Sequence, residues 1–282
     1  MTRALRPDDA KAALALSSEA GWNQTVSDWH FMLAAGEARG QLTAAGALVA
    51  SALILPYAGR IAWIGMVLTT ESHRLRGLAT ANLRWAIDRC AARGLIAGLD
   101  ATPAGREVYA PQGFCDLWGL QRLCADHPVL PEPLHRFAIR PMRTDDLAAV
   151  AALDAAAFGA RRDALLRFLH GCRPACAWIA QRAAGDIAGF VLGRAGRTTL
   201  HIGPLIARDP DIAIALAARA LAQVSEGPPV SMDVLDGQRL FRQRLVEAGF
   251  VPLRPFTRML RSNDAASADA GLTFAIARPE LG

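Results

Sequence analysis

The seven residues from 74 to 80 have the types and spacing of a turn that binds phosphate. They read Arg-Leu-Arg-Gly-Leu-Ala-Thr and follow an apolar, strand-like run over residues 61–68. An amphipathic, helix-like run over residues 79–90 comes directly after them. A chain that leaves a strand and enters a helix here points unpaired backbone N–H groups, and the positive end of the helix dipole, at one place. Gly77 and Ala79 let the backbone approach a ligand, and Arg74 and Arg76 add charged donors. The segment therefore predicts a pyrophosphate site.

Two more landmarks follow the turn. A strand-like run over residues 94–100 ends at Asp100, and Tyr109 lies four residues before the pair Gly113-Phe114. Together with the turn and the run over residues 63–68 before it, these landmarks resemble the GNAT superfamily of acetyl-CoA-dependent N-acetyltransferases. The resemblance is strongest over residues 44–123. It implies an α/β fold with a mixed sheet and the transfer of an acetyl group from acetyl-CoA to an amine.

The resemblance also implies roles for particular residues. The backbone of the fourth strand would bond to the pantetheine arm, the turn would hold the pyrophosphate, and Tyr109 would protonate the departing thiolate. Thr102 stands where the family often has Asn, and Gly105 replaces an Ala of the family pattern; both changes concern the positioning of the coenzyme. The coenzyme-binding residues expected on this basis are Met66, Val67, Leu68, Arg74, Leu75, Arg76, Gly77, Leu78, Ala79, Thr80 and Thr102.

Acetyl transfer to an amine needs a polarised carbonyl, a neutral amine and a proton for the sulfur. A backbone N–H near Val67 is the family-like donor to the carbonyl. A phenol with a pKa near 10, such as that of Tyr109, can protonate a thiolate, although the same residue could be a core aromatic. Asp100 is the nearest carboxylate that could act as the base, and it could equally be a turn residue. Glu19 and Glu71 are further candidates, and a water chain would leave no trace in the sequence.

The chain contains two copies of one pattern. The string that begins at Arg6 recurs at Arg143, Ile64-Gly65 recurs as Ile202-Gly203, and Gly113-Phe114 recurs as Gly249-Phe250. Three landmarks at nearly one offset indicate tandem copies of one fold. We expect an N-terminal catalytic domain over residues 1–127, a Pro-rich linker over 128–136 and a C-terminal domain over 137–282.

The second copy lacks the chemistry of the first. At the 138-residue offset, Arg74, Gly77 and Ala79 align with Ile212, Ala215 and Ala217, and Asp209 and Asp211 flank the helix start. Those aspartates would repel a pyrophosphate. Leu245 stands at the position of Tyr109. The second copy is therefore interpreted as a degenerate domain that supports the first or shapes the acceptor site.

The alternation of segments in each copy favours an α/β sandwich. In the first copy the sequence predicts helices over residues 8–20, 27–35, 79–90 and 106–111, and strands over 44–55, 61–68, 94–100 and 114–123. In the second it predicts helices over 144–158, 163–169, 210–222 and 238–248, and strands over 177–181, 189–193, 199–205, 230–235 and 251–260.

Composition limits the other function classes. The chain has 282 residues and a net charge of +5, and no apolar stretch reaches the roughly 20 residues of a membrane span. Asp8, Asp9 and Lys11 occupy the place of a signal peptide's apolar region, so we expect a cytoplasmic protein with no membrane partner. Arginines are interspersed with acids, which argues against a nucleic-acid partner. The five cysteines form no C-x-x-C pair, and we expect no metal site.

The acceptor is the least determined part of the prediction. Trp22 and Trp29 could line an acceptor pocket or belong to the core, and the same question applies to Asp154, Phe158, Arg161 and Arg162. We expect a monomeric or homodimeric enzyme that acetylates a primary amine of a small molecule by direct attack. Two alternatives remain: a non-catalytic acyl-CoA sensor or scaffold, and an acetyltransferase acting on protein lysines or N-termini.

Overall fold

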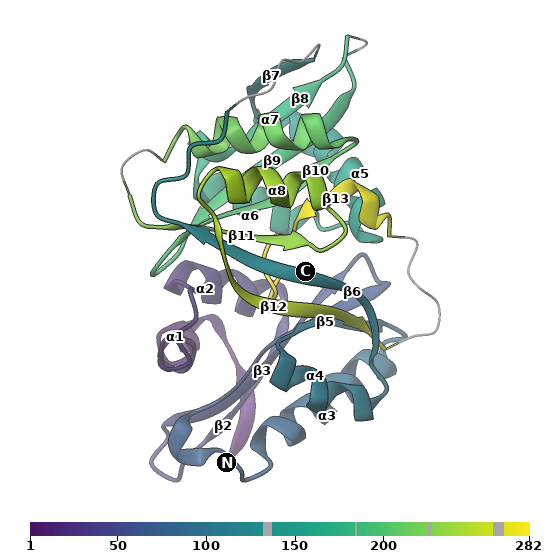
Figure 1. Cartoon of the computed structure of the whole chain (residues 1–282). Helices are drawn as coiled ribbons and strands as arrows, with labels where there is room; N and C mark the ends of the chain where they lie inside the picture. Colours follow the sequence, from purple (N-terminus) through teal and green to yellow (C-terminus); the bar gives the residue numbers. More distant parts are fainter. Residues whose placement is uncertain (132–136, 184, 225–226, 262–267) are drawn as a thin grey trace.

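The computed structural model contains one continuous mixed sheet of thirteen strands with helices on both faces (Figure 1). The structure describes residues 1–131, 137–183, 185–224, 227–261 and 268–282. The strand order is β1-β2-β3-β4-β5-β12-β6-β11-β13-β10-β9-β8-β7. Each half repeats the same succession of strands and helices, so the expected α/β fold with two similar copies is confirmed. The first half contains β1 (Thr2–Leu5), α1 (Ala10–Glu19), α2 (Val26–Ala35), β2 (Glu37–Leu42), β3 (Leu48–Tyr57), β4 (Ile61–Thr69), α3 (Leu78–Ala92), β5 (Ile96–Ala101), α4 (Pro103–Tyr109) and β6 (Cys115–Ala125). The second contains β7 (Ala138–Pro141), α5 (Leu147–Phe158), α6 (Asp163–Cys172), β8 (Trp178–Gln181), β9 (Ile187–Ala195), β10 (Leu200–Ala207), α7 (Pro210–Leu221), β11 (Val230–Leu235), α8 (Arg239–Glu247), β12 (Val251–Leu260) and β13 (Thr273–Ala275).

The closing strands of the two halves are exchanged. β12 from the second half pairs with β5 of the first half and with β6, while β6 pairs with β11 of the second half. The teal β6 and the yellow-green β12 therefore lie side by side at the centre of the sheet (Figure 1). The division at residues 128–136 remains a prediction, and residues 132–136 lie outside the described part of the chain. In space, each half of the sheet is completed by a strand of the other.

The helices divide between the two faces of the sheet. On one face, α1, α2, α5 and α6 bury their apolar sides in a single cluster that runs through both halves and includes Trp29, Trp63 and Phe190. Stacking of Phe31 on Phe168, with ring centroids 4.3 Å apart, joins α2 to α6 within it. On the other face, α3 packs on β3, β4 and β5 in one cluster, and α7 and α8 pack on the second half in another. The shared cluster holds the two halves in one arrangement because burial of apolar area is the main stabilising contribution.

Three differences from the sequence-based expectations have local causes. The strand expected over residues 44–55 begins only at Leu48, as β3, because residues 43–47 form a turn from β2, in which Thr43 and Ala47 bond to each other and Gly46 takes a φ of 83°. The helix expected over residues 106–111 begins at Pro103, because the Thr102 hydroxyl caps it. The strands β1, β2, β7 and β13 were not expected. β1, β7 and β13 have only three or four residues, which carry almost no periodic signal, and β2 is rich in polar residues and glycine.

Candidate functional site

The strands β4 and β5 separate halfway along their length and open the sheet. They pair in parallel only from Ile61↔Ile96 to Trp63↔Gly98. Just beyond, the register of β3 with β4 shifts by one residue, and Met66 takes a positive φ of 52°. Positive φ in a non-glycine residue costs of order 1–3 kcal/mol and occurs mainly where function requires it. The Ser51 hydroxyl donates to the Met66 carbonyl at 2.8 Å and so stabilises the bulge.

A cavity of about 310 Å³ lies at this opening. Residues 64–67 of β4, the end of β5 and helix α4 contribute to its lining, and the α1–α2 loop, β6, β12 and the final residues of the chain complete it. Both halves of the protein therefore build it. The lining residues are Trp22, Asn23, Gln24, Ile64, Gly65, Met66, Val67, Leu99, Asp100, Thr102, Ala104, Gly105, Val108, Tyr109, Arg122, Arg254, Phe256, Arg278, Pro279 and Glu280.

The predicted phosphate turn joins β4 to α3 and faces solvent. Arg74, Leu75, Arg76 and Gly77 are exposed, and Leu78, Ala79 and Thr80 form the first turn of α3. Leu75 and Gly77 have φ values of 61° and 73°, so the chain turns sharply before the helix begins. The first-turn amides have no intrahelical acceptor, and nothing lies within 4 Å of a side chain built at Gly77. The turn thus leaves open space and free donors for a diphosphate.

Tyr109 ends α4 and lines the cavity. Burial raises the pKa of its phenol to about 12, because desolvation penalises the phenolate. The group is therefore protonated at neutral pH and can donate a proton. A Cβ at position 105 would lie 3.0 Å from Cε2 of the Tyr109 ring, so the glycine lets the ring pack closely on its own helix. This contact gives a physical reason for Gly105, one of the two departures noted from the sequence.

Asp100 and Thr102 lie at the end of β5 and both line the cavity. The Thr102 hydroxyl accepts a hydrogen bond from Gly105 N at 3.2 Å and caps α4. The Asp100 side chain is fully buried, and Arg258 of β12 donates to both of its oxygens at 2.8 and 2.7 Å. Burial raises the pKa of Asp100, while the charge of Arg258 opposes that shift. The exchanged strand therefore supplies the direct partner of the candidate base.

The final residues of the chain form part of the cavity wall, which the sequence analysis did not anticipate. A side chain at Gly65 would lie 3.2 Å from the Cα atom of Glu280, so β4 and this segment are in close contact. Trp63 Nε1 donates to the Pro279 carbonyl and Tyr57 OH to the Leu281 carbonyl, each at 2.8 Å. Residues 276–282 are therefore anchored against the opening of the first half.

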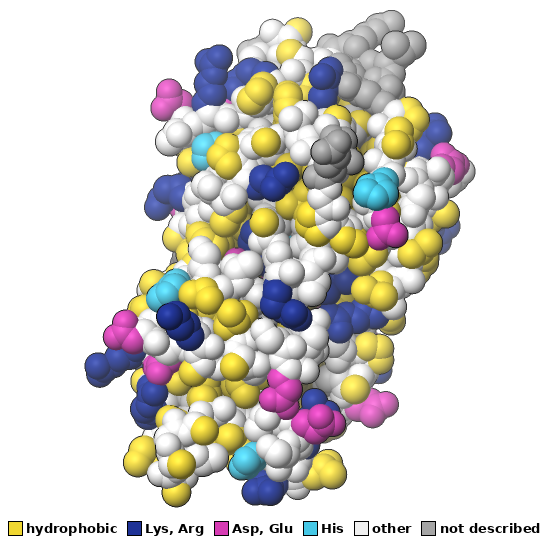
Figure 2. Space-filling model, turned by 90° about the vertical axis from the view of Figure 1, so that its left-hand side faces the viewer, with side chains coloured by type: hydrophobic (Ala, Val, Ile, Leu, Met, Phe, Trp, Pro, Cys, Tyr) yellow, Lys and Arg dark blue, Asp and Glu magenta, His cyan; other side chains and the backbone are white. Residues whose placement is uncertain are grey.

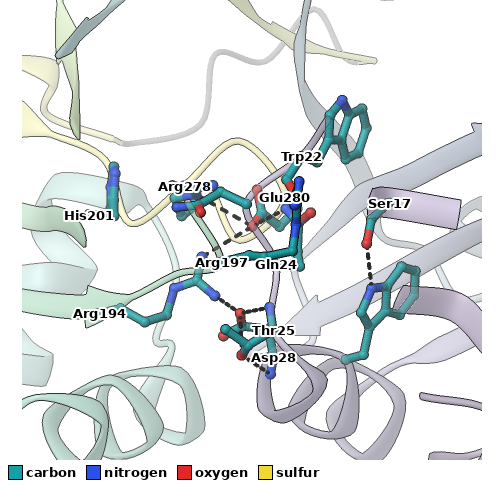
Figure 3. Close-up of polar contacts among 12 residues, drawn as sticks. Ser17, Trp22, Gln24, Thr25, Asp28, Arg194, Arg197, His201, Arg278 and Glu280 are labelled. Carbon is teal, nitrogen blue, oxygen red and sulfur yellow. Dashed lines mark hydrogen bonds and ion pairs between the residues drawn. The ribbon is translucent and has the colours of Figure 1, made fainter. Parts of the chain in front are cut away.

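Glu280 is the buried acid of this segment (Figure 3). Its Oε1 accepts from Gln24 at 2.7 Å and lies 3.6 Å from Nε of Arg278 and 3.7 Å from Nη2 of Arg194. Arg194 also pairs with Asp28 of α2. Burial alone would raise the pKa of Glu280, but the two arginines outweigh it and hold the pKa below its ordinary value. Proximity in sequence offered no signal for this cluster, since its members come from three distant segments.

The corresponding opening in the second half is filled by the chain itself. β10 and β11 pair at Leu200↔Val230 and His201↔Ser231, and then β13 inserts between them. The Asp209 carboxylate accepts from Ile212 N at 2.9 Å and caps α7, the counterpart of α3. An acidic cap occupies the helix start where a phosphate would need free donors. These two features give a structural reason for regarding the second copy as degenerate.

The remaining candidates from the sequence separate into different places. Trp22 lines the cavity, whereas Trp29 lies in the core with Nε1 donating to Ser17. Arg162 forms a buried ion pair with Asp154 and donates to the main-chain oxygen of Gly282. It therefore anchors the end of the final segment outside the cavity lining. Phe158 contacts the rings of Tyr57 and Trp63 in the same layer, and Arg161 pairs with Asp163. Glu19 bonds to Thr70 and Glu71, away from the cavity lining.

Charge on the molecular surface is mixed in sign. Figure 2 shows basic and acidic side chains interspersed over the face that it presents. No helix in the described ranges is both long and apolar enough to cross a bilayer. Within the same ranges, no three His, Cys, Asp or Glu side chains gather in a way that could hold a metal ion.

Comparisons with known proteins agree with this architecture. Residues 10–114 match the model described as the acetyltransferase (GNAT) family, and residues 150–275 match the model described as an acetyltransferase (GNAT) domain. The chain is 27% identical to YitH of Bacillus subtilis, an uncharacterized N-acetyltransferase, over 87% of this chain and 86% of that protein. It is 26% identical to the holothin acyltransferase of a Pseudoalteromonas species, over 83% of this chain and 78% of that protein. A provisionally assigned acetyltransferase from Pyrococcus horikoshii has the same fold, with a TM-score of 0.79, 18% identity and coverage of 100% and 95% of the two chains.

Proposed function

The chain belongs to the GNAT acetyltransferase family, and on that premise we propose that it transfers an acetyl group from acetyl-CoA to a primary amine of a small molecule. The observation that carries the proposal is the cavity at the separation of β4 from β5, whose lining includes Met66, Val67 and Tyr109. The family matches and the acyltransferase relative support the reaction class. The predicted phosphate turn, Arg74 to Thr80, lies between β4 and α3 and supports coenzyme binding at this half.

The residues of this site offer partners for the diphosphate, the pantetheine arm and the thioester of acetyl-CoA. The main-chain donors at the start of α3 hold the diphosphate, with Arg74 and Arg76 at the rim. The unpaired edge of β4 from Met66 to Leu68 bonds to the pantetheine arm, and Thr102 fixes α4 beside it. The thioester then lies in the cavity close to Tyr109. As the reaction's acyl donor, this coenzyme is a substrate of the protein.

Each step of the transfer has a residue to serve it. The Val67 amide donates to the thioester oxygen, on which negative charge develops. The amine nitrogen forms a bond to the acetyl carbon as the carbon–sulfur bond breaks, and Tyr109 gives its proton to the sulfur. Asp100 is our candidate to receive the proton of the amine, because burial raises the pKa of its carboxylate. The two hydrogen bonds from Arg258 occupy two of the roughly four acceptor positions on the Asp100 carboxylate, so the others remain for the amine.

The size of the cavity supports a small acceptor. Residues 278–280 and two strands from the centre of the sheet, β6 and β12, contribute to its lining. A volume of about 310 Å³ is at the lower end of the range for ligand pockets, roughly 300–1,000 Å³. A protein substrate needs an open groove that admits a chain running past the reacting amine, whereas side chains from both halves of the protein line this cavity.

The test is a panel of amines assayed for free thiol release by the full chain. Tyr109→Phe should lower kcat by about 100-fold or more while coenzyme A still binds, as measured by calorimetry. Tyr57→Phe is the matched control, because it removes the hydroxyl of the other tyrosine, whose side chain lies outside the cavity lining. This control should lose some stability and keep its turnover. Binding of coenzyme A with no thiol release from any amine would favour a sensor.

A further inference from the structure

Two arginines face each other across neighbouring strands at the cavity. Arg122 of β6 and Arg254 of β12 are register partners, so their side chains leave the same face of the sheet. Their guanidinium carbons lie 5.0 and 4.9 Å from the centroid of the same ring, that of Phe256. Like charges directly opposite one another destabilise a sheet.

Only one of these two arginines has an acid partner. Arg122 donates to both oxygens of Asp233 at 2.7 Å, whereas Arg254 has no ion pair within the described ranges. The Nε of Arg254 is buried and bonds to none of the described residues. Burial and the charge of Arg122 both lower the pKa of Arg254, which reflects an unfavourable environment for its charge. A bound anion would relieve that cost.

Arg278 adds a third guanidinium to the same lining. It is 1% exposed, and among the described residues its Nε and Nη1 find no hydrogen-bond acceptor. Its contact with Glu280 is an ion pair at 3.6 Å rather than a hydrogen bond. Burial, opposed by the charge of Glu280 and assisted by that of Arg122, lowers the pKa of Arg278 to about 10. Buried donors of this kind are costly unless a ligand satisfies them.

The charged side chains that line the cavity, counted together with their ion-pair partners, do not balance. The carboxylates number four and the guanidiniums five, which leaves one positive charge in excess. The carboxylates are Asp28, Asp100, Asp233 and Glu280, and the guanidiniums are Arg122, Arg194, Arg254, Arg258 and Arg278. A ligand with one anionic group would neutralise that excess.

We propose that Arg254 and Arg278 bind an anionic group of the acceptor, and that the acceptor is therefore a small amino carboxylate of the amino-acid type. This inference rests on the proposed acetyl transfer and names its substrate class. The anion binds at the two guanidiniums, and the amine points towards Tyr109 of α4, whose side chain lines the same cavity. Glu280 holds Arg278 in place and is a positioning residue.

The experiment compares each standard amino acid that has a primary α-amine and no side-chain carboxylate with its α-carboxamide, which keeps the α-amine and lacks the α-carboxylate. Thiol release should show a kcat/KM about tenfold to a hundredfold higher for the preferred acid than for its amide, the range expected for a hydrogen bond to a charged group. Aminoalkyl phosphonates form a second arm, which separates a carboxylate from a phosphate-type anion. A preference for the phosphonates would overturn the carboxylate assignment.

Two variants and a control complete the test. Arg254→Gln and Arg278→Gln should each raise the KM for the amino acid and bring the acid-to-amide ratio close to one. Arg239→Gln, an exposed arginine of α8, loses the same charge away from the cavity and should keep the ratio. If amides and simple amines react as well as acids and the ratio is unchanged in Arg254→Gln, this inference fails while acetyl transfer stands. If no amine of any arm releases thiol, both fail.

Discussion

Replacing Asp233 with Asn removes the acid from a buried pair at the centre of the sheet. Asp233 of β11 is fully buried, and Arg122 of β6 binds both of its oxygens. β6 comes from the first half of the chain and β11 from the second, so this pair joins the two halves at the exchanged strands. The substitution leaves the guanidinium of Arg122 buried without a negative partner and still facing Arg254.

The expected cost follows from that burial. Removing one partner of a buried ion pair typically destabilises a protein by about 3–5 kcal/mol. Total stabilities are about 5–15 kcal/mol, so the loss is a large fraction. At roughly 2–4 °C per kcal/mol for large domains, the melting temperature should fall by about 6–20 °C. Asp233→Asn should also raise the KM for the acceptor, because Arg122, which loses its partner, lines the cavity.

Thermal and urea unfolding followed by circular dichroism measure the loss. Asp236→Asn is the matched control, three residues further along the chain, where the side chain is 52% exposed and pairs with Arg242 at 3.0 Å. An exposed pair contributes at most about 1 kcal/mol, so this control should be almost as stable as the natural protein. If the two variants differ by less than about 1 kcal/mol, the reasoning that the exchanged strands depend on a buried pair is refuted.

Three further predictions concern the site and its pH dependence. Gly105→Ala places a Cβ 3.0 Å from the Tyr109 ring and should lower kcat at least tenfold with coenzyme affinity unchanged in calorimetry; an unaltered kcat would contradict the packing argument. Ser51→Ala leaves the Met66 carbonyl without its hydroxyl donor, so stability should fall by about 1–3 kcal/mol and the KM for acetyl-CoA should rise, and normal values for both would disprove a role for the bulge. Burial raises the pKa of Asp233 but Arg122 outweighs it, so the folded pKa lies below the ordinary value near 4 and the unfolded chain takes up protons first. The contribution of Asp233 to the free energy of unfolding is thus present above about pH 4 and is lost as the pH falls. Urea unfolding at several pH values checks this, and equal acid sensitivity of the natural protein and Asp233→Asn would contradict it.

Local sequence signals predicted residues of the first half that the structure places at the candidate site, because those residues are close together in the chain. The predicted phosphate turn begins at Arg74, shortly after β4 ends at Thr69, and the distance from Tyr109 to Gly113 is fixed by one short helix and a turn. The degenerate character of the second copy was also visible, since Asp209 stands at the start of α7. Such features depend on neighbours within a few residues, and backbone geometry determines where their side chains go.

The other half of the site depends on pairing between distant strands. Arg122 and Arg254 meet only because β6 and β12 are exchanged, and Arg258 reaches Asp100 for the same reason. Each copy read alone predicts that its own closing strand completes its own sheet, and periodicity cannot distinguish the two arrangements. The contribution of Glu280 depends on a short segment packed against Gly65, which has no regular pattern to predict.

A crystal structure of the protein with coenzyme A tests the central claim most directly. The account predicts the diphosphate on the main-chain donors of residues 76–80 at the start of α3, with the thiol in the cavity within reach of the Tyr109 hydroxyl. Coenzyme A bound between β10 and β11 of the second half, or away from the β4–α3 turn altogether, would contradict it.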